Sequence, residues 1–279
     1  MWALASILYR LGLHQINVFK ANLLRSLAAL LFLLALTAAL NLWNWIAILL
    51  SPLALYAIGS GYIGLGIGDC CYFACIRRIG VSRATPLAYS YPFFVIVLAV
   101  LTLNEPLTLE VCLGTLLIVI GVYFVSSTTA EVSSKTFDLR GVLYGISTSF
   151  LWALSIYILK LASEQANFIE FNTARLLLLI PFLLALNMVF KEPFSKLQPL
   201  TKREAVFLAL GGVLALGIGD LMLIYSLSIG QASLVAPLSA TQPLFAILLA
   251  LLILRERISK KLIIGAVLVV LGAALLIVV

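Results

Sequence analysis

The sequence predicts an all-α fold: a polytopic membrane helix bundle of ten helices, arranged as two inverted five-helix repeats. Composition is the first observation behind this prediction. Of the 279 residues, 63% are hydrophobic and 10% are charged, whereas about a quarter of the residues of a soluble domain are charged. The apolar segments are continuous runs of helical length and do not alternate as the strands of a membrane β-barrel do, so we expect helices to cross the bilayer.

Duplication is the second observation. The sequence Gly-Ile-Gly-Asp occurs at residues 66–69 and again at 217–220. Other residues recur at an offset of 150 or 151, namely Trp2 and Trp152, Asn22 and Asn172, Arg25 and Arg175, Pro86 and Pro237, Pro92 and Pro243, Glu105 and Glu256, Gly114 and Gly265, and Gly121 and Gly272. The repeat predicts a first five-helix domain over 1–128, a linker over 129–137 and a second five-helix domain over 138–279.

Apolar runs place the spans along the chain. They are predicted near residues 18–40, 52–76, 83–103, 107–127, 138–161, 168–190, 203–227, 233–253 and 258–278. A shorter run over 1–13 would reach only ~20 Å, less than the ~30 Å hydrocarbon core. Because nothing in the first half matches residues 138–150, we expect the chain to begin inside a truncated first helix.

Basic loops set the expected orientation. Five spans per repeat is an odd number, so the second copy must enter the membrane from the opposite side. With the repeats inverted, the basic loops at 77–83, 191–203 and 255–261 all fall on one face. Basic loops are typical of the cytoplasmic side, so we expect a multi-pass protein of the plasma membrane with both termini outside. This explains the formal net charge of +7 better than a nucleic-acid partner does.

Four charged residues lie well inside predicted spans, away from the span ends. Each would cost about 2.5–3.5 kcal/mol near the bilayer centre if it were left unpaired. We therefore predict that Arg25 pairs with Asp69 and that Arg175 pairs with Asp220. One hypothesis is that these pairs couple transport to an ion or act as alternating gates. The alternative is that they are static ties between neighbouring helices.

Polar residues around two prolines form the candidate substrate cavity. Pro92 and Pro243 are predicted to kink the fourth and ninth helices, since each leaves a carbonyl without its helical partner. Interrupted helices in corresponding positions are typical of transporter binding sites, although a plain structural kink is the alternative. The polar residues assigned to the cavity are Tyr89, Ser90, Tyr91, Ser239, Thr241 and Gln242, with Asn22 and Asn172 one turn before the arginines.

Other residue types exclude several function classes. The four cysteines and the single histidine have neither the spacing of a zinc site nor that of a disulfide framework, so no metal and no cofactor are expected. No nucleotide-binding loop is present. An integral membrane enzyme is therefore disfavoured. The glycine pairs at 114 and 121 and at 265 and 272 predict close helix packing, either within the bundle or across a homodimer.

The ordered motifs resemble a known family. Gly-Asp late in the third helix, two prolines six residues apart in the fourth and a glutamate just after it occur in both copies, as in EamA-type transporters of the drug/metabolite transporter superfamily. The resemblance implies ten helices in two inverted bundles, alternating access without ATP, and a central cavity. The cavity positions it implies are Asp69, Tyr89, Ser90, Tyr91, Asp220, Thr241 and Gln242.

We accordingly expect a secondary active transporter of small organic metabolites, amino-acid-like or related. Its expected partners are a small-molecule substrate and the lipid bilayer. Two alternatives stay open: a flippase for a lipid-linked metabolite, and a non-transporting membrane scaffold.

Overall fold

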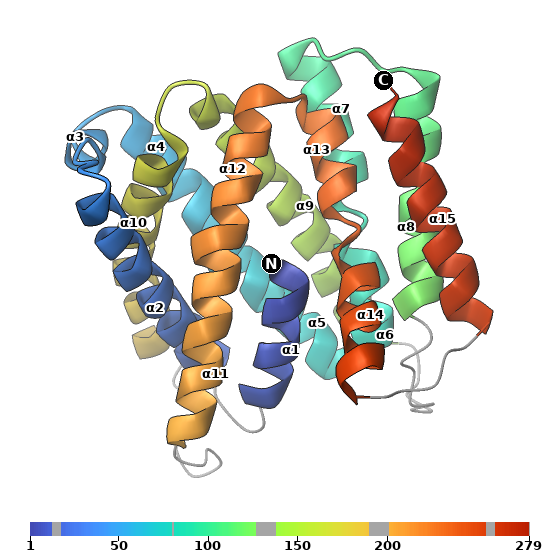
Figure 1. The fold of residues 1–279 in the computed structure, drawn as a ribbon, viewed down its shortest axis with the longest axis horizontal. Coiled ribbons are helices and arrows are strands. Elements are labelled where there is room, and N and C mark those ends of the chain that lie inside the picture. Colours follow the sequence, from blue (N-terminus) through green and yellow to red (C-terminus); the bar gives the residue numbers. More distant parts are fainter. Residues whose placement is uncertain (13–17, 80, 127–137, 190–200, 255–259, 279) are drawn as a thin grey trace. The chain divides into compact units, whose positions relative to one another are not determined.

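The computed structural model describes residues 1–12, 18–79, 81–126, 138–189, 201–254 and 260–278. Every regular element within these ranges is a helix (Figure 1). Eight helical stretches are long and apolar enough to cross a membrane: Phe19–Ala39, Leu53–Ile76, Arg83–Leu103, Leu109–Ser126, Leu139–Ser163, Phe168–Val189, Lys202–Ile229 and Lys260–Ile277. The prediction of an all-α, polytopic membrane bundle is confirmed, while the count of ten spans stays a prediction.

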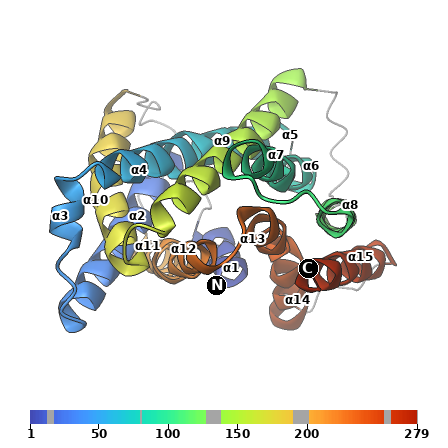
Figure 2. The ribbon, with the colours of Figure 1, turned by 90° about the horizontal axis from the view of Figure 1, so that it is seen from above.

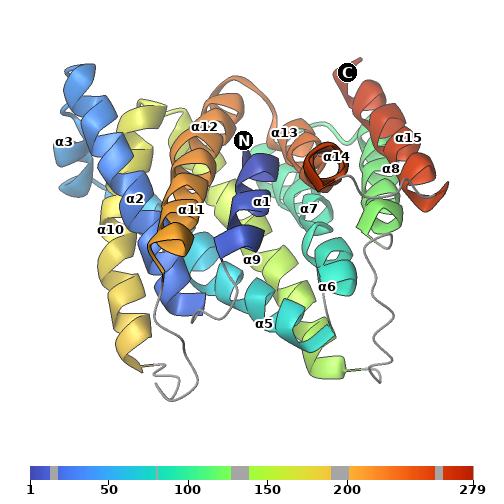
Figure 3. The ribbon, with the colours of Figure 1, turned by 60° about the horizontal axis from the view of Figure 1, so that its bottom comes forward.

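The chain divides into two compact units, and each unit draws on both halves of the sequence. Unit 1 consists of Met1–Gly66 and Ile158–Ile229. Its helices are α1 (Trp2–Gly12), α2 (Val18–Ala39), α3 (Trp45–Leu49), α4 (Leu53–Ser60), α10 (Phe168–Val189), α11 (Lys202–Gly212), the π-helical η4 (Val213–Gly219) and α12 (Asp220–Ile229). Helices α11, η4 and α12 follow one another as a continuous rod, and α2 packs against both α10 and α11 (Figure 3).

Unit 2 consists of Ile67–Tyr157 and Gly230–Val279. Its helices are α5 (Asp69–Ile79), α6 (Val81–Ala88), α7 (Tyr91–Leu103), α8 (Leu109–Ser126), α13 (Ala232–Ser239), α14 (Gln242–Leu254) and α15 (Lys260–Ile277). Two helices contribute to both units, the π-helical η1 (Gly61–Gly68) and α9 (Leu139–Ser163). The predicted repeats at 1–128 and 138–279 thus cut across the compact units.

Helices α8 and α15 of unit 2 are in backbone contact through their glycines (Figure 2). A Cβ atom at Gly121 would lie 2.7 Å from the carbonyl oxygen of Gly265, and one at Gly265 would lie 2.7 Å from that of Gly121. Gly114 and Gly272 face each other in the same way, at 2.9 and 2.5 Å. The glycine pattern is therefore explained by packing within one chain, and a homodimer would need another surface.

Two π-helical segments interrupt the α-helical spans at corresponding places. η1 ends at Gly68 and η4 ends at Gly219, so each is followed directly by an aspartate. Such i→i+5 segments are rare and are frequent at functional sites. In η4 the missing side chains admit close neighbours, because a Cβ atom at Gly217 would lie 2.9 Å from the ring of Phe32 and one at Gly219 would lie 2.6 Å from Trp2 Nε1.

The proline-containing spans are broken into two helices each. The chain turns at Tyr89 and Ser90 between α6 and α7, and at Ala240 and Thr241 between α13 and α14. Pro92 is the second residue of α7, a position that tolerates proline because the amide there has no helical partner. Sequence analysis predicted kinks at Pro92 and Pro243, and the structure instead has full interruptions just before both prolines.

Candidate functional site

Asp220 lies at the centre of a buried polar cluster in unit 1. Its Oδ2 accepts a hydrogen bond from Arg175 Nη1 at 2.8 Å, and its Oδ1 accepts one from Trp2 Nε1 at 3.2 Å. Only 4% of Asp220 and 2% of Arg175 are exposed. The predicted pairing of Arg175 with Asp220 is therefore confirmed, and it places two opposite charges together in a segment that is otherwise apolar.

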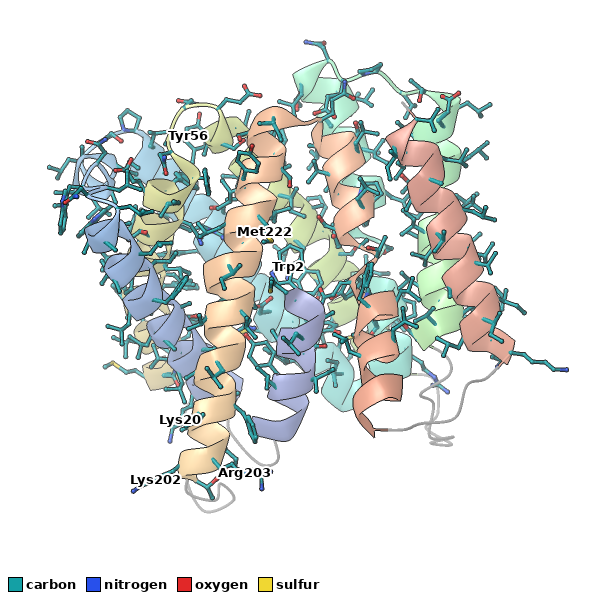
Figure 4. All side chains as sticks on the ribbon, viewed as in Figure 1. Trp2, Lys20, Tyr56, Lys202, Arg203 and Met222 are labelled. Carbon is teal, nitrogen blue, oxygen red and sulfur yellow. The ribbon has the colours of Figure 1, made fainter. Side chains whose placement is uncertain are left out.

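Trp2 contacts the acid and the π-helical segment at once. The same indole N–H that reaches Asp220 also donates to the carbonyl oxygen of Ala215 in η4, at 3.1 Å. Figure 4 shows Trp2 at the start of α1, beside the α11–α12 rod. Sequence reasoning missed this role, although Trp2 and Trp152 recur at the same offset, 150 residues, as Arg25 and Arg175.

Asn172 joins Arg175 to η4. Its Nδ2 donates to the carbonyl oxygen of Leu216 at 2.9 Å, and its Oδ1 accepts from Arg175 Nη1 at 3.5 Å. The Nε of Arg175 is buried and has no hydrogen-bond partner among the described residues. The guanidinium therefore depends on Asp220 and Asn172 for its compensation.

An equivalent arrangement surrounds Arg25 in the same unit. Asn22 Nδ2 donates to the carbonyl oxygen of Leu65 in η1 at 2.8 Å, and Asn22 Oδ1 accepts from Arg25 Nε at 2.8 Å. The guanidinium of Arg25 lies over the ring of Tyr9, 5.4 Å from its centroid, a favourable position for a cation. Arg25 belongs to unit 1 and Asp69 to unit 2, so their predicted pairing stays a prediction.

Asp69 has its own tryptophan in unit 2. Trp152 Nε1 donates to Asp69 Oδ1 at 3.0 Å. The Trp152 ring in turn contacts three tyrosine rings, with centroid distances of 5.1 Å to Tyr72, 5.7 Å to Tyr89 and 6.2 Å to Tyr91. The acid is thus held at the edge of an aromatic cluster, which the structure builds from α5, α9 and the α6–α7 break.

The two broken spans meet through polar side chains within unit 2. Tyr89 donates from its hydroxyl to Gln242 Oε1 at 2.7 Å, and Tyr91 donates to the carbonyl oxygen of Ala236 at 3.1 Å. The structure therefore brings three of the predicted cavity residues together. The hydroxyl groups of Ser90 and Ser149 lie 3.0 Å apart.

Two further predicted cavity residues, Ser239 and Thr241, lie at the break between α13 and α14. Thr241 donates to the carbonyl oxygen of Leu238 at 2.7 Å, within the turn that separates α13 from α14. Ser239 is the last residue of α13. Contact of either residue with a solute stays a prediction.

Glu105 holds the start of α13. Its two carboxylate oxygens accept hydrogen bonds from the backbone amides of Ala232 and Ser233, at 2.8 and 2.9 Å. The N-cap residue Gln231 makes no side-chain cap of its own, so Glu105, which follows α7, supplies a cap from elsewhere in the chain. A carboxylate at a helix N-terminus also interacts favourably with the helix dipole.

A second ion pair lies beyond the end of a predicted span in unit 2. Arg78 Nη1 donates to Asp138 Oδ2 at 3.1 Å, and Asp138 Oδ1 accepts from the amides of Arg140 and Gly141 at the start of α9. The hydrogen bond from Arg78, together with those amides, holds the pKa of Asp138 below its usual range. Among the described residues, no group of three or more histidine, cysteine or acidic side chains is placed to hold a metal ion.

Comparison with known proteins gives a consistent result. The model of the EamA-like transporter family matches residues 1–127 and 139–278. An uncharacterized transporter of Archaeoglobus fulgidus is 29% identical over 275 residues, which is 99% of this chain and 93% of that protein. The uncharacterized transporter YoaV of Bacillus subtilis is 23% identical over 275 residues, 98% of this chain and 91% of that protein. One solved crystal structure shares the fold, with a TM-score of 0.82, 19% identity, and coverage of 98% of this chain and 92% of that one.

Proposed function

Because the chain belongs to the EamA-like transporter family and is a membrane transporter, we propose that it moves small organic metabolites by alternating access. It acts as a secondary active transporter, and its solutes are amino-acid-like or related molecules. The observation that carries this proposal is the Arg175–Asp220 pair, since buried charges inside apolar spans are typical of solute and ion pathways.

The solute contacts are proposed at the two helix breaks of unit 2. Interrupted helices in corresponding positions of the two copies support this assignment, because unwound backbone within a membrane span is tolerated where it faces a cavity or is buried in protein. Tyr89, Tyr91 and Gln242 already meet there. Ser90, Ser239 and Thr241 are assigned to the same region because they lie at or beside these breaks.

Coupling or gating is proposed for the intramembrane charges, with Asp220 and Arg175 as one element and Asp69 and Arg25 as the other. Protonation or solute binding at either acid would change which partner it holds, and a change of partner can bias a two-state equilibrium. The reciprocal tryptophan bonds support this, because they tie each acid to a helix from the opposite half of the chain.

Basic residues support a cytoplasmic assignment for one end of unit 1. Figure 4 shows Lys20, Lys202 and Arg203 at the same end of this unit, and Tyr56 at the other. Positive residues favour the cytoplasmic side. We assign the lysine and arginine end to the cytoplasm, and the protein to the plasma membrane.

Purified protein in liposomes tests the function. Uptake and efflux are measured for a panel of amino acids, amines and sugars, with and without an imposed pH gradient. We expect one class to be transported and the gradient to accelerate it. Transport of a labelled lipid-linked sugar in place of every soluble solute would support the flippase, and no transport of any kind would support the scaffold.

Two variants with a control test the site. Asp220→Asn and Asp69→Asn are expected to abolish the response to the pH gradient. The control is Glu164→Gln, which removes an acid whose side chain is 59% exposed and which, just after the end of α9, pairs with Lys160. If both aspartate variants kept transport and its pH dependence, the coupling role would be wrong.

A further inference from the structure

Each of the two π-helical segments accepts a hydrogen bond from an asparagine side chain. Leu65 in η1 and Leu216 in η4 both lie four residues before the aspartate that follows the segment. The carbonyl oxygen of each accepts a hydrogen bond from an asparagine amide, at 2.8 Å from Asn22 and 2.9 Å from Asn172. The same contact is therefore built twice, once in each half of the sequence.

Both asparagines are buried and bonded to the protein through Nδ2 and Oδ1. Each donates from Nδ2 to a π-segment carbonyl, and each accepts at Oδ1 from the arginine three residues later. Asn22 is 1% exposed and Asn172 is 0% exposed. A solute that reached either amide would have to displace hydrogen bonds that are already buried, which is costly.

We propose that Asn22 and Asn172 are positioning residues: Asn172 clamps η4 and thereby sets the direction in which Asp220 leaves this segment, and Asn22 clamps the part of η1 that belongs to unit 1. They do not contact the solute, so the role replaces the substrate contact that sequence analysis predicted for them. The proposal rests on the coupling function proposed above for the two acids.

The helix register explains why a clamp is needed. One residue of an α-helix corresponds to a rotation of about 100°. If η4 relaxed to α-helical geometry, Asp220 would turn by about that angle relative to α11, and its carboxylate would leave Arg175 on α10. The two hydrogen bonds of Trp2 would change as well, because its indole N–H is shared between Ala215 of η4 and Asp220. The indole of Trp2 therefore reports the register of η4.

A spectroscopic experiment tests the clamp without any transport assay. The full chain is labelled with 5-fluorotryptophan in lipid nanodiscs, and the ¹⁹F signal of Trp2 is assigned with Trp2→Phe. Asn172→Leu removes both hydrogen bonds of the clamp, and Asn172→Ser is a milder change that also loses the contact with Leu216. We expect either variant to shift the Trp2 signal and to leave that of the exposed Trp43 in place.

The matched control is Asn187→Leu. Asn187 lies on the same helix and also donates to backbone carbonyls, but these are those of Phe19 in α2 and Leu183 in α10 and not of η4. We expect the Trp2 signal to be unchanged in this variant. A Trp2 signal unmoved in both Asn172 variants, or moved as far by Asn187→Leu, would overturn the proposal.

Transport kinetics separate a positioning residue from a solute contact. For a transported solute, we expect Asn172→Ser to lower the maximal rate about tenfold, with KM within about twofold of the unmodified protein. A rise in KM at an unchanged maximal rate would instead make Asn172 a solute contact. If the unmodified protein transports nothing, the proposed function fails, and the ¹⁹F result still decides whether the clamp exists.

Discussion

Removing one member of the Arg175–Asp220 pair should destabilise the protein far more than removing both. In Asp220→Leu, the guanidinium of Arg175 stays 2% exposed, with Asn172 Oδ1 at 3.5 Å as its remaining partner in unit 1. Leaving one charge of a buried pair uncompensated costs about 3–5 kcal/mol, and a lone charge at the centre of a membrane helix costs about 2.5–3.5 kcal/mol. The two estimates agree, so we expect a loss of roughly 3–4 kcal/mol.

A double-mutant cycle measures this effect. Asp220→Leu, Arg175→Met and the double variant are unfolded by titration with sodium dodecyl sulfate in mixed micelles, and tryptophan fluorescence is followed. Replacing both charges by apolar side chains of similar volume is often neutral or stabilising, so the double variant should recover most of the loss. Glu164→Gln is the control and should change stability by less than about 1 kcal/mol, because the Glu164 side chain is 59% exposed and Lys160 keeps its hydrogen bond to the carbonyl oxygen of Leu227. If the double variant lost as much free energy of unfolding as the two single variants together, the favourable interaction between the two charges would be refuted.

The same double variant separates the two hypotheses for the pair. If the charges only tie α10 to α12, a double variant that recovers stability should also recover transport. If Asp220 couples or gates transport, the double variant should unfold at about the same detergent concentration as the unmodified protein. Its transport should nevertheless stay insensitive to an imposed pH gradient. Full recovery of both stability and gradient-driven transport would exclude the coupling role.

Three further predictions follow from contacts in the two units. Gly121→Ala should lower the free energy of unfolding by roughly 1–2 kcal/mol, because overpacking against a carbonyl 2.7 Å away on α15 outweighs the helix preference of alanine. Gly59→Ala is its control and should be neutral or stabilising, since its Cβ would meet a side chain at 3.4 Å; both are measured by detergent titration. Glu105→Ala should cost about 1–2 kcal/mol through loss of the cap on α13, and faster hydrogen exchange at the start of α13 would accompany it. Because the pKa of Asp138 is lowered in the folded protein, its contribution to stability is present above the pKa of the unfolded chain and is lost as the pH falls through the folded pKa; thermal unfolding of Asp138→Asn should lack this acidic decrease.

Sequence repeats were sufficient to predict the charged pair of unit 1. Asp220 and Arg175 stand out because they are charged within apolar runs, and because both recur in the other half. The cost of an unpaired charge then leaves pairing as the economical arrangement. The prolines indicated the region of the two interruptions but only as kinks at Pro92 and Pro243, because proline removes a backbone donor wherever it occurs in a span.

The π-helical segments could not be predicted in this way. Their carbonyls accept hydrogen bonds from residues far away in the sequence, since Trp2 donates to Ala215 and Asn172 donates to Leu216. In the sequence, the glycines of these segments indicate only close packing or a local break. The assignment of Asn22 and Asn172 to a substrate cavity stays a prediction, because polarity within a span does not reveal whether the partner is a solute or a backbone carbonyl.

Each of the two acids accepts a hydrogen bond from a tryptophan of the opposite repeat. Trp2 belongs to the first half of the sequence and donates to Asp220 of the second, whereas Trp152 belongs to the second half and donates to Asp69 of the first. Each acid therefore takes one hydrogen bond from a helix of the opposite repeat, and each compact unit contains segments of both. A single repeat cannot supply both the acid and its indole donor in this arrangement. A buried carboxylate that loses a hydrogen-bond donor costs free energy. The two acids are therefore more stable in the duplicated chain than in either half alone, and the hydrogen bonding of each acid depends on both halves.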